Sequence, residues 1–369
     1  VAHAGTLDAV DDRTRAKRML ELCLAGAGAT LVRADGIVFP LVVSGYLLLH
    51  ARRDDALALA ATAIGAMAAH VAWRLTYYGF PLPNTFYAKV SGPLLQRLAH
   101  GAGDLVEVGW RSCLLPPVVA IGWANVAAVR EARRRPTSAI DVARAVPFEA
   151  WMAGALLPFW VFVGGDLYEE RFLLVLYLAG FASLSRATAS YSRRARAALA
   201  VGFIGLQMAV GVRFGHEMPP KYDQFTSLGE FLHEHVPASR SLAIDAAGKV
   251  PYLTAMPAID MLGLSDLYLG HKAAAFFSVG HNKYDADYVM RRRPDLIAAF
   301  LDLDAPATFD LDWGLRESLY RKNGYRVRYM LNTGPASNGH DVVDVAGLAD
   351  ADLRALSQRG YHYAVLERR

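Results

Sequence analysis

The sequence of 369 residues has little charge and almost no cysteine. Only 20% of its residues are charged, against about 25% in an ordinary soluble chain, while 54% are hydrophobic. Cys23 and Cys113 both lie in apolar runs, without the His or Cys spacing of a metal site. This excludes a disulfide framework and predicts two buried packing residues. The composition also excludes a disordered chain and a collagen-like repeat.

Several motifs of soluble enzymes are missing as well. The chain has no nucleophile elbow and no dinucleotide-binding fingerprint. Gly248-Lys249 lacks the spacing of a P-loop, and His233-Glu234-His235 is too short for a zinc-protease motif. The polar residues 1–18 contain no visible signal peptide. None of these soluble enzyme classes is therefore indicated.

Between Met19 and Phe214 the chain consists of apolar segments separated by short charged loops. A membrane-spanning helix needs about 20 apolar residues, and so many apolar segments in one stretch would leave no polar face for water. The sequence therefore predicts a membrane α-helical bundle of about seven transmembrane helices over residues 19–214. The segments cover residues 19–32, 36–50, 56–76, 105–129, 146–163, 171–185 and 196–214.

The loop charges alternate along these segments. One set of loops is poor in basic residues and holds Arg33, Lys89, Arg97 and Arg171. By the positive-inside rule the rich set is cytoplasmic, which makes residues 1–18 a cytoplasmic segment and places the chain after Phe214 on the outer side of the membrane. The net charge of +4 then needs no nucleic-acid partner. The rich set comprises Arg13, Arg15, Lys17, Arg18, Arg52, Arg53, Arg130, Arg133, Arg134, Arg135, Arg144, Arg186, Arg193, Arg194 and Arg196.

Residues 215–369 have the composition of a soluble domain, with 17 Lys and Arg against 20 Asp and Glu. Apolar spacing predicts a helix over 225–235 and a second one over 284–293, which Pro294 ends. Short apolar runs predict strands over 241–245, 295–301, 325–331 and 361–366. Helices that alternate with strands indicate a small extracytoplasmic α/β domain.

Polar residues gather at the predicted outer ends of the spans, where ionisable groups indicate function. In the stretch 77–89, Pro81 and Pro83 argue against a helix. The lysine of this stretch suits a phosphate group, although an aromatic belt with a lysine that reaches the interface explains the same residues. The candidate substrate-binding residues here are Tyr78, Asn84, Thr85 and Lys89.

A second outer loop begins with Gly164-Gly165, a pair that permits a positive φ or a close backbone approach. Asp166 and Arg171 in this loop would pair with each other, or bind sugar hydroxyls, a divalent cation or a phosphate. Asp166 is the one candidate metal ligand, and a divalent cation the one cofactor that this loop suggests. The turn Arg33-Ala34-Asp35-Gly36 is better explained by an Arg–Asp pair that holds the turn.

In the C-terminal domain the candidates follow a predicted strand. Asp245 comes at the end of the 241–245 strand, before the turn at Gly248, and Tyr252 lies shortly after it. Loops that follow strands are common places for binding residues. Asp245 and Tyr252 therefore join the candidate substrate-binding residues.

Four stretches together resemble the GT-C membrane glycosyltransferases related to the mycobacterial terminal β-(1→2)-arabinofuranosyltransferase. The resemblance runs from about Leu20 to about Asp266 and is weaker beyond. Tyr168 stands where the family pattern usually has Met. The stretches are YYGFPLPNTFYAKV (77–90), RADG (33–36), GGDLYEERF (164–172) and DAAGKVPYL with PAIDMLGLSD (245–266).

The resemblance implies transfer of a sugar from a polyprenyl-phosphate donor to a glycan, glycolipid or protein acceptor at the outer face of the membrane. Lys89 and Arg171 would then stabilise the leaving phosphate, and Asp166 would orient sugar hydroxyls or a cation. Asn84 and Tyr78 would line the sugar or lipid site. The membrane lipid is a further expected partner.

The family places its key acidic residue in the first outer loop, and nothing in this sequence matches that loop. We therefore expect the catalytic general base to lie upstream of Val1, in a longer protein. The alternatives are a non-enzymatic glycolipid transporter, an envelope-assembly membrane protein, or an inactive shortened relative.

Overall fold

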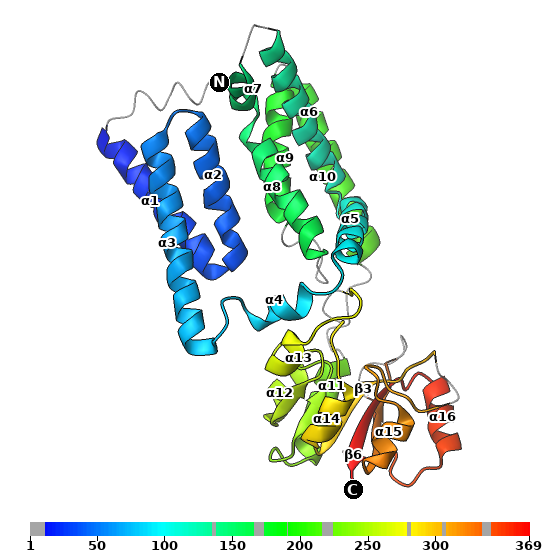
Figure 1. Cartoon of the computed structure of the whole chain (residues 1–369). Helices are drawn as coiled ribbons and strands as arrows, with labels where there is room; N and C mark the ends of the chain where they lie inside the picture. Colours follow the sequence, from blue (N-terminus) through cyan, green and yellow to red (C-terminus); the bar gives the residue numbers. More distant parts are fainter. Residues whose placement is uncertain are drawn as a thin grey trace. The chain divides into compact units, whose positions relative to one another are not determined.

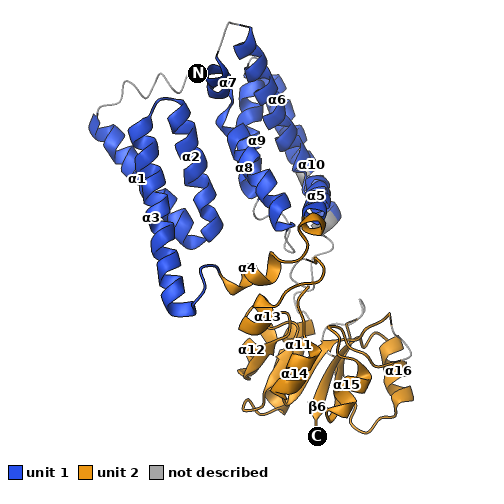
Figure 2. Cartoon of the chain, in the orientation of Figure 1, with its two compact units in different colours: residues 1–82, 98–216 blue, residues 83–97, 217–369 orange. Residues whose placement is uncertain are grey.

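The computed structural model describes residues 12–134, 138–165, 173–189, 191–215, 224–278, 282–304, 308–333 and 341–369. The chain forms two compact units, shown in different colours in Figure 2. Unit 1 contains residues 1–82 and 98–216, and unit 2 contains residues 83–97 and 217–369. The predicted domain boundary at 214/215 lies close to the last of these transitions, whereas the inclusion of 83–97 in unit 2 has no counterpart in the sequence analysis.

Unit 1 is helical throughout its described residues (Figure 1). Six of the seven predicted apolar segments correspond to a single helix each. The short helix α7, in the charged loop before residue 146, was not predicted. The elements are α1 (Asp12–Val32), the 3-10 helix η1 (Ala34–Ile37), α2 (Val38–Leu49), α3 (Arg53–Tyr78), α5 (Leu94–Arg111, whose first turn belongs to unit 2), α6 (Leu115–Arg133), α7 (Ala139–Ala145), α8 (Phe148–Val163), α9 (Leu174–Ala187) and α10 (Arg193–Gly215).

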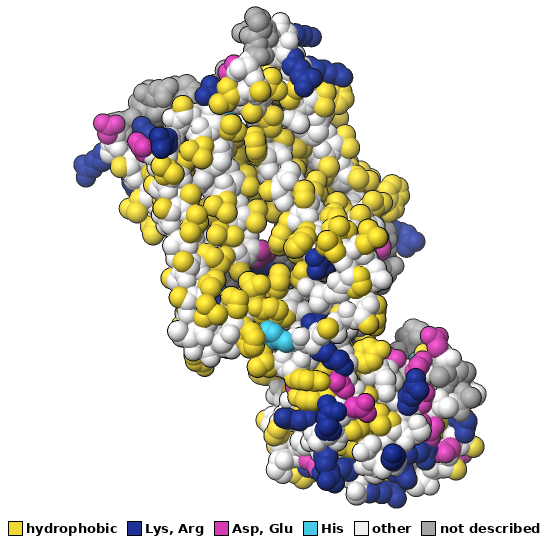
Figure 3. Space-filling view, viewed as in Figure 1, with side chains coloured by type: hydrophobic (Ala, Val, Ile, Leu, Met, Phe, Trp, Pro, Cys, Tyr) yellow, Lys and Arg dark blue, Asp and Glu magenta, His cyan; other side chains and the backbone are white. Residues whose placement is uncertain are grey.

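The exterior of these helices is strongly apolar, and Figure 3 shows hydrophobic side chains along their length. Within the described residues, α3 is long and apolar enough to cross a membrane, and only 17% of its apolar window is buried. The number of such spans rises to three if the bent pairs α5–α6 and α7–α8 each count as one. The predicted bundle of seven spans is therefore not confirmed and stays a prediction.

The prediction of one continuous segment over 105–129 is wrong. The chain breaks between α5 and α6, which are bent by 103°. Pro116 and Pro117 lie in the first turn of α6, where they lack the N–H groups that would continue a helix from α5. Cys113 at the break has a φ of 54° and is buried, as predicted, whereas Cys23 is only half-buried.

Contacts bring the basic segments of unit 1 to one end of its helices. Asp55 at the start of α3 pairs with Arg15 of α1 at 2.8 Å and with Arg52 at 2.6 Å. Arg144 of α7 donates to the carbonyl of Leu49, the last residue of α2, at 2.5 Å. At the α8–α9 side, Arg186 at the end of α9 pairs with Glu149 at the start of α8. The loops that the charge alternation groups together thus share one end of this unit.

The other end of unit 1 contains two of the predicted glycine-dependent turns. Arg33 and Asp35 form the expected ion pair at 3.0 Å, and a side chain at Gly36 would come within 2.2 Å of the Ala29 carbonyl oxygen. Gly164 and Gly165 have φ values of 89° and 84°. The sequence predicted that this glycine pair permits either a positive φ or a close backbone approach, and both glycines have a positive φ.

Unit 2 contains a six-stranded mixed sheet with the strand order β2-β1-β3-β6-β4-β5. Strands β2, β1 and β3 are parallel, while β6 is antiparallel to both β3 and β4. The strands are β1 (Leu242–Ile244), β2 (Ala258–Asp260), β3 (Leu296–Phe300), β4 (Tyr325–Leu331), β5 (Val342–Asp344) and β6 (Tyr363–Arg368). The helices are α4 (Asn84–Lys89), α11 (Gln224–His235), α12 (Lys249–Thr254), α13 (Leu267–His271), α14 (Ala286–Arg292), α15 (Glu317–Lys322) and α16 (Asp350–Gln358).

Two hydrophobic clusters cover the two faces of this sheet. Leu242 and Ile244 of β1 pack with residues of α11 and α12, whereas Ala243 between them packs with residues of α14, α15 and α16. This alternation is the period of two that a strand buried on both faces shows. The four predicted strands and both predicted helices are confirmed, although the last strand runs two residues further.

Residues 83–97 are part of unit 2, and the prediction of no helix over 77–89 is wrong at both ends, because α3 runs to Tyr78 and α4 covers Asn84–Lys89. Pro83 is the N-cap residue of α4, which begins at Asn84. A proline is well tolerated at the start of a helix, because the first N–H groups of a helix have no partner within it. The two prolines therefore exclude a helix only as far as Pro83.

Buried polar side chains attach α4 to the C-terminal sheet domain. The Asn84 amide nitrogen donates to the carbonyls of Gly263, Leu264 and Asp266 at 2.9, 3.2 and 3.0 Å. The ammonium of Lys283, which is only 4% exposed, donates to the carbonyls of Tyr87 and Gly270 at 2.8 and 2.5 Å. Burial lowers the pKa of Lys283.

We predict that Asn84→Asp destabilises unit 2. The substitution keeps the shape of the side chain but replaces the amide N–H donor with a carboxylate oxygen, which cannot donate a hydrogen bond to the three carbonyls. The expected loss is about 3 kcal/mol of unfolding free energy, measured by calorimetry of the whole chain, together with faster hydrogen exchange over residues 83–97.

The matched control for this variant is Thr85→Val. Thr85 is the next residue on α4 and its side chain is exposed, so the expected change is below about 0.5 kcal/mol. Equal stability of Asn84→Asp and the wild type would contradict the attachment of α4 by Asn84.

Candidate functional site

The carboxyl ends of the parallel strands gather acidic residues at one edge of the sheet in unit 2. Asp245 directly follows β1, Asp260 ends β2, and Asp302 lies two residues after β3. From β1 the chain passes to β2 on one side, and from β2 it crosses to β3 on the other. Such a change of direction opens a crevice at the carboxyl ends of the strands, where α/β proteins bind ligands.

Asp245 is 7% exposed and holds two aromatic side chains. Its Oδ1 accepts a hydrogen bond from the Tyr363 hydroxyl at 2.6 Å, and its Oδ2 accepts one from the Trp313 indole at 3.1 Å. Burial raises the pKa of Asp245 despite these two hydrogen bonds. Burial and the nearby carboxylate of Asp245 raise the pKa of Tyr363. Asp245 therefore positions the two rings and has both oxygens occupied.

Trp313 has a backbone conformation that a bulky residue rarely adopts. Its φ is 65°, and that of the following Gly314 is 75°. Such conformations cost energy and persist where the surrounding contacts hold them, often at functional sites. The hydrogen bond to Asp245 and the ring of Tyr284, whose centroid lies 6.0 Å from that of Trp313, are two such contacts.

Asp312 is a second carboxylate of this cluster with a raised pKa. Burial, and then the negative charges of Asp302, Asp245 and Asp304, raise its pKa to about 6. In the described part of the chain its carboxylate accepts no hydrogen bond, while its backbone N–H donates to Phe300. A carboxylate with this pKa can exchange a proton near neutral pH, as a general acid or base does.

The described residues of the chain contain no group of three or more His, Cys, Asp or Glu side chains arranged to hold a metal ion. Asp260 uses its carboxylate on its own loop, accepting hydrogen bonds from the backbone of Leu262, Gly263 and Ser265. At this edge, Asp245 and Asp260 thus use their carboxylates within the protein.

Residues 283 and 284 link α4 to this edge. Lys283 holds the carbonyl of Tyr87 on α4, and the adjacent Tyr284 contributes its ring to Trp313. The Tyr87 ring in turn lies 4.2 Å from the ring of His271, between centroids. The predicted residues on α4 and Asp245 are therefore parts of one connected structure in unit 2.

The structure places the three candidates on α4 in different surroundings. Asn84 has its amide nitrogen committed to the 263–266 loop, while its oxygen is buried without a hydrogen bond. Thr85 is exposed, and Lys89 is the last residue of α4 and half-buried. Only Thr85 thus presents a fully accessible side chain.

The remaining candidates are not gathered here. Tyr78 ends α3 in unit 1, where its ring lies 4.7 Å from that of Tyr77 and the Arg74 guanidinium lies 4.9 Å from its centroid. Tyr252 on α12 is 86% exposed. Asp166 and Arg171 lie outside the described residues.

Four residues of this region were not predicted as site residues from the sequence: Asp312, Trp313, Tyr363 and Lys283. A signal for two of them is the run Asp312-Trp313-Gly314, in which an aromatic residue between a carboxylate and a glycine indicates a turn that presents a ring. Lys283 gave no signal, because a single lysine in a polar loop predicts an exposed side chain.

Residues 215–332 match a family described as a domain of unknown function (DUF8728). This range covers β1, β2, β3 and β4, together with Asp245 and Trp313, and leaves out α4 and Tyr363. Comparison with curated proteins and with solved structures gives no match.

We predict that Asp312→Asn stabilises the protein at neutral pH. In the folded chain the pKa of Asp312 is about 6, against 3.8 for the unfolded reference. Ionisation of Asp312 therefore lowers the free energy of unfolding of the protein as the pH rises from about 4 to about 6. The asparagine variant avoids this loss. Because the group is half exposed, the gain above pH 6 is about 1 kcal/mol, less than the full shift implies.

Calorimetric unfolding of both proteins between pH 4 and pH 8 measures this difference. It should be absent at pH 4, grow up to about pH 6 and stay constant above that value. A constant difference over the whole range would rule out titration of Asp312 as its cause.

Proposed function

We propose that the chain is the donor-binding part of a polyprenyl-phosphate-sugar-dependent glycosyltransferase of the GT-C type, and that the sugar is an arabinofuranosyl group. It would act at the outer face of a bacterial plasma membrane, with unit 2 extracytoplasmic. The acceptor would be a cell-envelope glycan, glycolipid or protein. The motifs at 33–36, 77–90, 164–172 and 245–266 are the reason for this choice.

The surface of unit 1 supports a membrane location. Large apolar side chains on several helices are exposed, among them Trp123 at 68%, Leu178 at 71% and Val201 at 69%. Exposed apolar surface on this scale is unfavourable in water and favourable in lipid. The basic end of the unit agrees with the positive-inside arrangement of a seven-span bundle.

The observation that carries the proposal is the attachment of α4 to unit 2. The chain leaves α3, the helix best suited to span a membrane, and directly enters a polar segment that is built into the α/β domain by Asn84 and Lys283. This segment holds Thr85 and Lys89 on a fixed support. A lipid-linked donor needs such a support, because its phosphate lies at the membrane surface while its sugar is in water.

The proposed reaction is an inverting transfer. An acidic base removes the proton of the acceptor hydroxyl, the acceptor oxygen bonds to the anomeric carbon, and the bond from that carbon to the phosphate oxygen breaks. The polyprenyl phosphate leaves with the electron pair, and Lys89 and Arg171 stabilise its charge. Asp166 would orient the sugar hydroxyls or hold a cation, and Tyr78 would line the lipid side.

A glycolipid transporter is the second candidate, and the bent helices favour it. Transporters bind substrates at discontinuous helices, and the α5–α6 and α7–α8 pairs are bent by 103° and 90°. A transporter would move the lipid-linked sugar without transferring it to an acceptor.

We predict that Lys89→Ala lowers sugar transfer at least about 100-fold in the full-length protein. The measurement is transfer of radiolabelled sugar from the polyprenyl-phosphate donor to envelope acceptors in isolated membranes, at equal protein levels. Lys89→Arg keeps the positive charge and should retain part of the activity.

The control is Lys272→Ala, which removes a lysine that pairs with Asp285 at 2.9 Å elsewhere in unit 2 and should leave transfer unchanged. Full activity of Lys89→Ala would refute the assignment of Lys89. Movement of the donor lipid without any transfer by the wild type would favour the transporter.

A further inference from the structure

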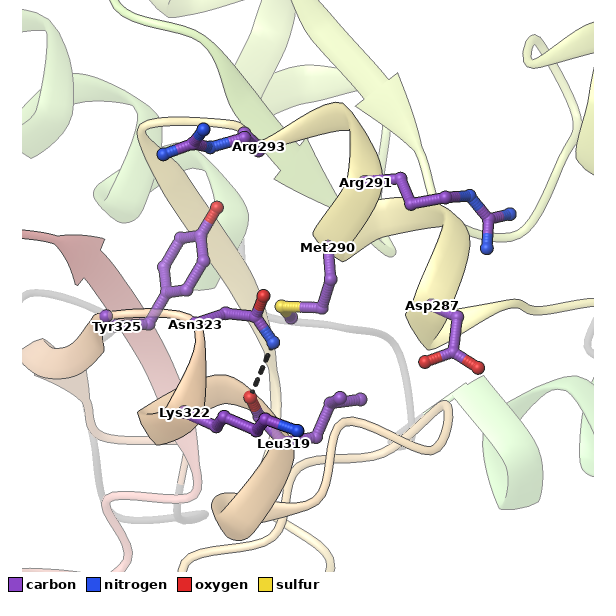
Figure 4. A pocket seen from close by; sticks show the side chains of 9 residues that line it. Asp287, Met290, Arg291, Arg293, Leu319, Lys322, Asn323 and Tyr325 are labelled. Atoms are coloured by element: carbon purple, nitrogen blue, oxygen red, sulfur yellow. Dashed lines mark hydrogen bonds between the residues drawn. The ribbon is translucent and has the colours of Figure 1, made fainter.

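A hollow of about 730 Å³ lies between α14 and α15 in unit 2. Its lining includes residues from the end of α14, the end of α15 and the first residue of β4. Figure 4 shows Arg291 and Arg293 on the α14 side and Lys322 and Asn323 on the α15 side. The volume falls within the range of small-molecule binding sites. This hollow adjoins the amino-terminal end of β3, whereas Asp245 and Asp312 lie at the opposite edge of the sheet.

The charge of the hollow is positive, because Arg291, Arg293 and Lys322 line it against the carboxylate of Asp287. In the described part of the chain, no ion pair or side-chain hydrogen bond engages Arg291, Arg293 or Lys322. Three carboxylates outside the lining are already paired, Glu317 and Asp350 with Arg321 and Asp295 with Arg368. Figure 3 shows Lys and Arg side chains over this unit.

Helix stability explains only part of this positive charge. Arg291 and Lys322 lie in the last turns of their helices, where cations interact favourably with the helix dipole. Arg293 is different, because it occupies the position after α14 with a φ of 49°, where glycine or asparagine is usual. Pro294 follows it, and the Tyr325 hydroxyl donates to the Pro294 carbonyl at 2.6 Å. The fold thus keeps an arginine in a conformation that costs energy.

We propose that this hollow binds a sugar that carries a phosphate or a carboxylate group. The guanidinium groups of Arg291 and Arg293 bind planar or tetrahedral oxyanions through paired hydrogen bonds, and Lys322 adds a point charge from the opposite side. Asp287, which also lines the hollow, and the side-chain oxygen of Asn323 accept hydrogen bonds from hydroxyl groups. The Asn323 amide nitrogen is already committed to the Leu319 carbonyl at 2.9 Å. This site does not depend on the proposed transferase activity.

The test is calorimetric titration of the whole chain, purified in lipid nanodiscs. The anionic probes are glucose 1-phosphate and digalacturonate, and the reference probes are glucose and inorganic phosphate. We expect a Kd below about 1 mM for at least one anionic sugar, at least about tenfold weaker binding of both reference probes, and weaker binding at high salt.

Three variants and one matched control locate the binding. Arg291→Gln, Lys322→Gln and Arg293→Gly should each weaken binding of the anionic sugar at least about tenfold, and Arg293→Gly should not lower the melting temperature because glycine suits this φ. Arg292→Gln is the control, since Arg292 belongs to the same run but lies 5.9 Å from the Tyr288 ring centroid and outside the lining. It should change the affinity less than about twofold.

Three results would overturn the proposal. The first is the absence of binding of both anionic sugars at 5 mM, roughly five times the expected upper limit of Kd. The second is an equal loss of affinity in Arg292→Gln and Arg291→Gln, which would indicate a diffuse charge effect. The third is binding of inorganic phosphate as tight as that of the anionic sugars, which would leave the sugar without a role.

Discussion

The backbone carbonyl groups of the 263–266 loop and of Gly270 must find hydrogen-bond donors once they leave water. The chain meets this need with Asn84 and Lys283, so that α4 and the loop after β2 are satisfied together. A buried carbonyl without a donor costs about 1–3 kcal/mol, and several are grouped here. These hydrogen bonds from Asn84 and Lys283 fix α4, and with it the positions of Thr85 and Lys89. They also support the link through Tyr284 to Trp313.

The two edges of the sheet in unit 2 have opposite electrostatic character. Near the carboxyl ends of β1 and β3, burial raises the pKa of Asp245, and burial together with the charges of nearby carboxylates raises the pKa of Asp312. Around the amino-terminal end of β3, arginines outnumber their carboxylate partners. Because parallel strands bring all their equivalent ends to one edge, the residues that follow these strands are gathered there. Different ligand chemistry is expected at each edge.

Local patterns predicted much of the fold. The runs at 241–245 and 295–301 are continuous apolar stretches with turns beside them, which is how strands buried on both faces appear in a sequence. Strands β2 and β5 were missed because each has only three residues and ends in an aspartate, whereas the equally short β1 is apolar throughout. The break at Cys113 was missed because the apolar content continues across it, although Pro116 and Pro117 mark its far side.

The candidate site was predicted only in part, for a physical reason. Asp245 was found because a carboxylate that ends an apolar strand stands out locally. Its partners Trp313 and Tyr363 lie 68 and 118 residues away, so no local spacing connects them. The same holds for Asn84 and Lys283, whose roles depend on partners 179 and 196 residues distant.

This distance has a consequence for the synthesis of the chain. Residues 83–97 leave the ribosome well before Gly263 and Lys283 are made, and at ordinary rates of translation the delay is roughly 10–40 s. A helix of six residues is not stable alone over that time. The segment that carries Thr85 and Lys89 therefore stays without its partners until Gly263 and Lys283 have been made. Residues 83–97 therefore acquire their structure late, although they are translated early.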